Sequence, residues 1–147
     1  KIYFAYIYTN KSTEGSQKAM IHALKDAGTG PEDIDYINAH ATSTPTGDLA
    51  EAVAINNLFG KKTPVSSTKS MTGHECWMSG ASEVVYSILM AKNGFIAPNI
   101  NFEALDYGCP EINVIGKTIE KTIHKSLSNS FGFGGTNAAL VLNFTGF

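Results

Sequence analysis

The chain has 147 residues, of which 43% are hydrophobic and 16% are charged, which is the composition of one ordinary globular domain. Its net charge is -2 and all of its basic residues are lysines, which excludes the basic surface of a nucleic-acid-binding protein and the arginine clamps that hold phosphate. No apolar run approaches the roughly 20 residues that cross a bilayer, and the start of the chain is too aromatic for a signal peptide. We therefore expect a cytoplasmic protein without a membrane span.

The first half of the chain alternates predicted strands and helices. Residues 2–8 are aromatic or β-branched and predict a buried strand, after which Ser12 or Thr13 is expected to cap a helix that ends at Gly28. A very short helix starts at Pro31, and a second strand leads into His40. Asp48 is expected to cap the next helix, which ends before Gly60. The residues expected to face inward from that helix are Leu49, Ala50, Val53, Ala54 and Leu58.

The second half continues the alternation. Residues 64–67 predict a short strand, and residues 80–92 have helical spacing, with Gly94 ending the helix. The segment from Pro98 to Cys109 is irregular. Three further strands are expected at 112–115, 126–130 and 138–144, the last two around the glycine turn 132–135. Because strands and helices alternate, the fold class is α/β, with an open, mixed but mostly parallel sheet flanked by helices.

Three predicted turns that follow strands carry the chemistry. They span 40–47, 68–74 and 130–137, and turns of this kind meet at one edge of an open α/β sheet, where ligands bind. The first carries His40 and several hydroxyl groups, the second carries Lys69 and His74, and the third holds Phe133 between glycines. Two histidines and a lysine without a convincing nucleophile predict a site that stabilises a developing oxyanion. Glu83 follows on the next helix, placed to hold Lys69 or His74.

Each of these motifs also has a simpler interpretation. A lone histidine at a strand end is usually structural, and hydroxyls beside it often cap turn backbone. Residues 66–69 match the SxxK of serine acylases without the motifs that accompany it, and GFGG departs from the dinucleotide pattern GxGxxG. Cys76 is disfavoured as a nucleophile by the neighbouring Glu75, and Cys109 is expected to be structural. Their spacing indicates neither a disulfide framework nor a zinc site.

Four segments in order resemble a known family. AHATSTPTGD, SSTKSMTGH, GFIAPNIN and NSFGFGGTNAALVL are similar to the C-terminal half of β-ketoacyl-[acyl-carrier-protein] synthases, the elongating condensing enzymes of fatty-acid and polyketide synthesis. The resemblance runs from about Glu14 to Phe144. It implies a thiolase-like fold in which residues 1–147 are the C-terminal domain and the nucleophilic cysteine belongs to an N-terminal half that this chain lacks.

The resemblance implies a decarboxylative Claisen condensation of malonyl-carrier protein with an enzyme-bound acyl thioester. His40 and His74 would bind the malonyl thioester carbonyl and support decarboxylation. Lys69 would order the site, with Glu83 beside it. The isolated chain would be inactive, and with its N-terminal half it would form a homodimer that works on acyl carrier protein.

Substrate contacts also follow from the resemblance. Thr42 and Thr44 would bond the phosphopantetheine arm of the carrier protein, and Phe133 would gate the site. Phe131 and Phe133 would provide an apolar setting for the carboxylate that leaves as CO2. The chain is expected to need no cofactor or metal of its own. A buried monovalent cation, found in some members, would correspond to Asn38, Glu83, Ser128 and Asn129.

The chain departs from the family pattern in several places. Trp77 and Met78 stand where the family has small residues, Ala41 stands in place of a glycine, and the segment 9–15 is shorter than usual. Two other functions stay open at this point. One is a non-catalytic partner subunit of the chain-length-factor type, which would not need His40, Lys69 and His74. The other is a thiolase or an initiating synthase, which His74 after TKSMTG disfavours.

Overall fold

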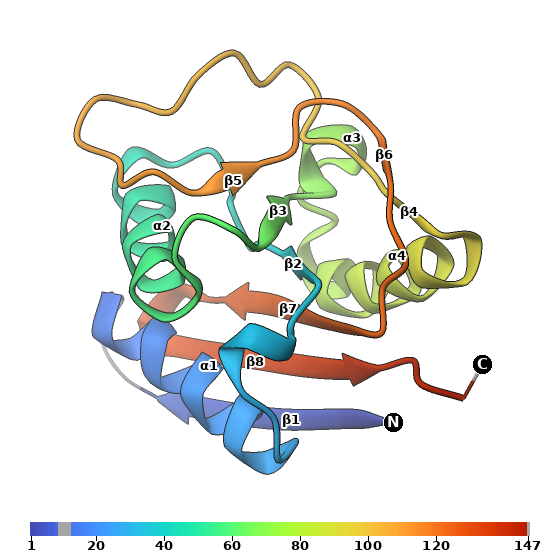
Figure 1. Cartoon of the computed structure of the whole chain (residues 1–147). Helices are drawn as coiled ribbons and strands as arrows, with labels where there is room; N and C mark the ends of the chain where they lie inside the picture. Colours follow the sequence, from blue (N-terminus) through green and yellow to red (C-terminus); the bar gives the residue numbers. More distant parts are fainter. Residues whose placement is uncertain (9–12, 147) are drawn as a thin grey trace.

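A six-stranded sheet forms the centre of the computed structural model, which describes residues 1–8 and 13–146 (Figure 1). The strands lie in the order β1-β8-β7-β2-β3-β5, and they are β1 (Ile2–Tyr8), β2 (Tyr36–Asn38), β3 (Pro64–Ser66), β5 (Asn113–Val114), β7 (Lys125–Phe131) and β8 (Thr136–Asn143). The pairs β7/β2, β2/β3 and β3/β5 are parallel, whereas β1/β8 and β8/β7 are antiparallel. The predicted α/β class and mixed, mostly parallel sheet are confirmed.

Helices cover both faces of this sheet. They are α1 (Thr13–Asp26), α2 (Pro45–Phe59), the single turn α3 (Lys69–Thr72) and α4 (Ser79–Asn93). Figure 1 shows α3 and α4 together at one side of the sheet, and the loop 99–112 arching above β5. None of the described helices has the length and apolar character needed to cross a membrane.

Two apolar clusters fill the space between the sheet and its helices. Alternation along β2 explains the division, because successive strand side chains point to opposite faces. Ile37 joins the cluster with Met20 of α1 and Ile55 of α2, whereas Tyr36 joins the cluster with Met90 of α4. The sheet is therefore a middle layer, with α1 and α2 on one face and α4 on the other.

The inward face predicted for α2 is confirmed only in part. Ala54 is buried and Leu58 packs against the core, whereas Leu49 is 42% exposed. The buried residues of the helix are Glu51, Ala52, Ala54, Ile55 and Phe59. Thr44, not Asp48, is the N-cap residue, because Pro45 occupies the first-turn position where a missing N–H costs nothing. The carboxylate of Asp48 instead accepts hydrogen bonds from the backbone N–H groups of Ser43 and Thr44, at 3.2 and 3.3 Å.

The remaining elements match the predictions closely. α1 begins at Thr13, and the alternative cap Ser12 and most of the short segment 9–15 lie outside the described residues. β1 is an edge strand whose Ile2 is exposed, so its predicted burial is not found there. Gly28, Gly60 and Gly94 follow their helices, as predicted, and all three have a positive φ. The two-residue strands β4 (Phe95–Ile96) and β6 (Ile119–Glu120) pair as a separate ribbon that the sequence pattern does not predict.

Candidate active site

The three predicted turns leave the same edge of the sheet. Ile37 of β2 is in register with Val65 of β3 and with Leu127 of β7, and both pairings are parallel. The carboxyl ends of the three strands therefore lie side by side, and the side chains that follow them meet. This is the position at which open α/β sheets bind ligands.

His40 and His74 lie edge to face at this sheet edge. Their ring centroids are 5.7 Å apart with an interplanar angle of 88°, and the ring of Phe131 lies 5.7 Å from that of His40. Phe131 is buried, His40 is half-buried and His74 is exposed. The two imidazoles, whose ring N–H groups can donate hydrogen bonds, thus lie together at this edge with the ring of Phe131 against His40.

Lys69 and Glu83 form a buried ion pair beneath the histidines. The ammonium group of Lys69, at the start of α3, donates to Oε1 of Glu83 in the second turn of α4, and both side chains are almost fully buried. Burial raises the pKa of Glu83 to about 7, and the attraction of Lys69 opposes part of that rise. A pair of this kind fixes α3, and with it the backbone that leads to His74.

Glu51 is the residue at this site that the sequence analysis missed. Its side chain is buried, and its two oxygens accept hydrogen bonds from the backbone N–H of His40 at 2.9 Å and of Ala41 at 2.8 Å. The side-chain amide of Asn129 donates a third, at 2.9 Å. Burial raises the pKa of Glu51 against these hydrogen bonds. Glu51 thus ties the turn that carries His40 to both α2 and β7.

Two oxygens in this buried polar layer accept no hydrogen bond from the described residues. They are Oε2 of Glu83 and Oδ1 of Asn129, and both atoms are inaccessible to solvent. Asn38, named with them as a cation ligand, exchanges hydrogen bonds with Thr68 at 3.3 Å. Buried oxygens beside the carboxylate of Glu51 are the donor set that a monovalent cation prefers, so the residues present fit such an ion.

Two cavities open beside the histidines. One, of about 240 Å³, is lined by His40, Thr42, Thr44, Phe131 and Phe133 among others. The other, of about 540 Å³, is lined by Thr42, Lys69 and His74 together with the segment 99–103. The hydroxyls of Thr42 and Thr44 lie 3.3 Å apart. The candidate residues named from the sequence therefore lie around one site, with Glu83 reaching it through Lys69.

Phe133 is highly exposed at the tip of the glycine turn. Gly134 and Gly135 have φ values of 78° and 91°, which side-chain-bearing residues rarely adopt. The backbone N–H of Gly132 donates to the carbonyl of Thr136 at 2.7 Å and closes the base of the turn.

The departures from the family pattern also have a place in the structure. Ala41 has a φ of 22°, which explains why a glycine suits this position. Trp77 and Met78 are exposed in the short helical turn before α4, close in sequence to His74. Cys76, also exposed, and Cys109 are both free thiols.

Comparison with known proteins shows which family the chain resembles in sequence. Residues 5–103 match the family model "Beta-ketoacyl synthase, C-terminal domain". The chain is 47% identical over 132 residues to 3-oxoacyl-[acyl-carrier-protein] synthase 1 of Escherichia coli K12, covering 89% of this chain and 32% of that protein. It is 50% identical over 132 residues to the synthase 1 of Haemophilus influenzae, with 88% and 32% covered.

Solved structures of ketosynthases also match this chain. A β-ketoacyl synthase from Burkholderia phymatum superposes with a TM-score of 0.90 at 35% identity, over 96% of this chain and 36% of that one. The ishigamide ketosynthase/chain length factor gives a TM-score of 0.91 at 31% identity, over 97% and 37%. The chain spans about a third of the length of these relatives. It belongs to the β-ketoacyl synthase family of condensing enzymes and corresponds to the C-terminal domain of that family.

Proposed function

We propose that this chain provides the malonyl-binding part of a 3-oxoacyl-[acyl-carrier-protein] synthase, and that the nucleophilic cysteine comes from sequence outside it. The whole enzyme would condense a malonyl thioester with an enzyme-bound acyl thioester. The observation that carries the proposal is the edge-to-face pair of His40 and His74 at the ends of parallel strands. Two imidazole donors that lie together at one edge of the sheet fit the oxygen of a thioester enolate.

The reaction starts when the malonyl thioester places its carbonyl oxygen between the two imidazoles. The bond between the α-carbon and the carboxylate breaks, CO2 leaves, and the electron pair passes into the thioester enolate, whose oxygen accepts the hydrogen bonds. The enolate carbon then attacks the acyl thioester carbonyl. The cysteine sulfur departs as a thiolate, and the β-ketoacyl chain stays on the carrier thiol.

The neighbouring residues hold and shield the reacting group. Thr42 and Thr44 line the same cavity as His40, which supports a role for their hydroxyls in bonding the amides of a phosphopantetheine arm. Phe131 and Phe133 give the departing carboxylate an apolar setting, in which loss of its charge as CO2 is favoured. Phe133, on its glycine turn, would admit and close off the thioesters.

The buried polar layer supports the histidines from below. Lys69, through its pair with Glu83, adds positive charge near the enolate and orders α3. A monovalent cation held by Glu51, Glu83, Asn129 and the neighbouring Asn38 and Ser128 would offset the buried negative charge. In this arrangement Glu51 orients His40 through the backbone and does not touch the substrate.

Partners follow from the relatives. One solved structure similar to this chain, with a TM-score of 0.88 and 30% identity, is a complex of a type II polyketide acyl-carrier protein with its ketosynthase. By analogy, acyl- and malonyl-loaded carrier protein is the proposed partner here, in a cytoplasmic homodimer of fatty-acid or related synthesis. The alternative, a chain-length-factor subunit, is motivated by relatives solved as ketosynthase/chain length factor pairs. The His40, Lys69 and His74 constellation favours the catalytic role.

The test is decarboxylation of malonyl-carrier protein by the natural full-length protein, measured as CO2 released. His74→Ala should lower the rate about 100-fold or more, the usual cost of removing one oxyanion donor. His22→Ala, an exposed histidine on α1, is the matched control and should leave the rate unchanged. Unchanged decarboxylation in His74→Ala would remove the proposed role, and a wild-type protein without any decarboxylation would favour the partner-subunit alternative.

A further inference from the structure

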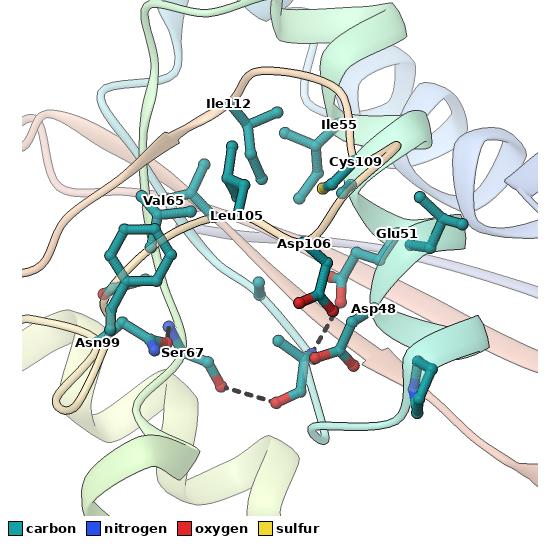
Figure 2. A pocket seen from close by; sticks show the side chains of 18 of the residues that line it. Asp48, Glu51, Ile55, Val65, Ser67, Asn99, Leu105, Asp106, Cys109 and Ile112 are labelled. Atoms are coloured by element: carbon teal, nitrogen blue, oxygen red, sulfur yellow. Dashed lines mark hydrogen bonds between the residues drawn. The ribbon is translucent and has the colours of Figure 1, made fainter.

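A third cavity lies on the other side of the turn that carries His40. It has a volume of about 330 Å³ and lies between α2, the strands β3 and β5, and the loop 99–112. Figure 2 shows Ile55 and Ile112 at one end and the carboxylates of Asp48 and Asp106 at the other, with Leu105 between them. The volume falls within the range of small-molecule sites in proteins, roughly 300–1,000 Å³. The proposed reaction assigns no role to this cavity.

Asp48 and Asp106 have no cationic partner among the described residues. In the part of the chain that the structure describes, neither Asp48 nor Asp106 forms an ion pair. Asp48 accepts hydrogen bonds from backbone N–H groups of the adjoining turn. Burial raises the pKa of Asp48, and the nearby charge of Asp106 adds to this rise. Two like charges at the end of an apolar cavity repel each other, and an organic cation between them would relieve that repulsion.

We propose that this cavity binds a small amphiphilic organic cation, a primary ammonium group on a short apolar chain. The ammonium lies between Asp48 and Asp106 and donates to both carboxylates. The apolar chain extends past Leu105 toward Ile55 and Ile112, where it displaces water from apolar surface. Each end of the ligand therefore has a matching end in the cavity.

The proposal concerns binding alone and stands whether or not the condensation chemistry is correct. Its determinants, the carboxylates of Asp48 and Asp106 and the apolar end, are not among the residues to which the proposed condensation gives a role. Cys109 lines the cavity and supplies a built-in reporter. Alkylation of its thiol by iodoacetamide should slow when the cavity is occupied. Because burial and the two carboxylates raise the pKa of this thiol, the measurement is made at mildly alkaline pH.

The experiment follows alkylation in the natural full-length protein by mass spectrometry after trypsin. Cleavage after Lys69, Lys92 and Lys117 places Cys76 and Cys109 in separate peptides, so Cys76 serves as the internal control. The probes are butylammonium, pentylammonium and hexylammonium, with hexanol and hexanoate as neutral and anionic controls. The dissociation constant is taken from the probe concentration that halves the alkylation rate of Cys109.

We expect the probes to protect Cys109 but not Cys76 from alkylation. Protection of Cys109 should be strongest with hexylammonium, weaker with hexanol and absent with hexanoate. Each added methylene should tighten binding about fourfold, the value of one buried CH2. Asp106→Asn should weaken hexylammonium binding about two- to fivefold, as for a partly exposed ion pair. Asp26→Asn on α1 is the matched control and should change nothing.

Three results would overturn the proposal. One is equal protection of both cysteines, which would mean unspecific binding. Another is an affinity that does not depend on charge. The wild type would then bind hexylammonium and hexanol equally well, or Asp106→Asn and the wild type would bind hexylammonium equally well. The last is a Cys109 that iodoacetamide cannot reach in the full-length protein, which would mean that other parts of the protein already fill the cavity.

Discussion

Replacing Glu51 by glutamine should damage the site although the side chains differ by only one atom type. Oε1 of Glu51 accepts from His40 N–H and from the Asn129 amide, while Oε2 accepts from Ala41 N–H at 2.8 Å. In Glu51→Gln one of these oxygens becomes an NH2 group that faces an N–H, donor against donor. The variant thus loses at least one hydrogen bond to a charged acceptor and leaves a backbone N–H without a partner, which costs about 2–3 kcal/mol.

Two measurements test this reasoning. Urea denaturation should show the free energy of unfolding of the domain falling by about 2–3 kcal/mol. The rate of malonyl decarboxylation in the folded variant should fall at least about tenfold, because His40 shifts with its backbone. Glu14→Gln, which removes an exposed carboxylate on α1, is the control and should change neither value noticeably. If Glu51→Gln behaves like Glu14→Gln, Glu51 does not hold the turn.

Two further predictions concern Glu83 and the turn residue Ala41. Burial raises the pKa of Glu83 from 4.5 to about 7, so its contribution to stability is full below pH 4.5 and is lost as the pH rises through 7. In a buffer without monovalent metal ions, the unfolding free energy of the wild type minus that of Glu83→Gln should therefore fall by about 3 kcal/mol from pH 4.5 to 8, and a pH-independent difference would contradict the raised pKa. In urea denaturation, Ala41→Gly should lower the free energy of unfolding by at least about 1 kcal/mol less than Ala39→Gly, because Ala41 has a positive φ and Ala39 does not. Equal losses would mean that Ala41 is not strained.

The sequence predicted helices best where hydrophobic residues recur with helical spacing and a glycine follows the last turn. Gly28, Gly60 and Gly94 end their helices because only glycine adopts positive φ without strain, so local chemistry decides those positions. The meeting of His40, Lys69 and His74 could also be predicted, since parallel strands end at the same edge of a sheet. Their roles in catalysis remain predictions.

The inward face of α2 could be predicted only in part from hydrophobicity. Glu51 lies in the apolar run LAEAVAI and resembles a solvent-exposed helix charge, but the N–H groups that it accepts come from a turn ten residues earlier. A carboxylate is buried there because tertiary contacts satisfy it, and Leu49 is left exposed as a consequence. The one signal available was a lone charge within an otherwise apolar stretch.

The glycine turn between β7 and β8 has a further consequence for timing. Its base is fixed where Phe131 pairs with Asn137 and where Gly132 bonds Thr136, so only Phe133, Gly134 and Gly135 can rearrange. A loop this short moves by local bond rotation in about nanoseconds to microseconds. Enzyme turnover typically takes about a millisecond to a second. In the proposed reaction Phe133 would therefore open and close many times per catalytic cycle, and its motion would be too fast to limit the rate of thioester exchange.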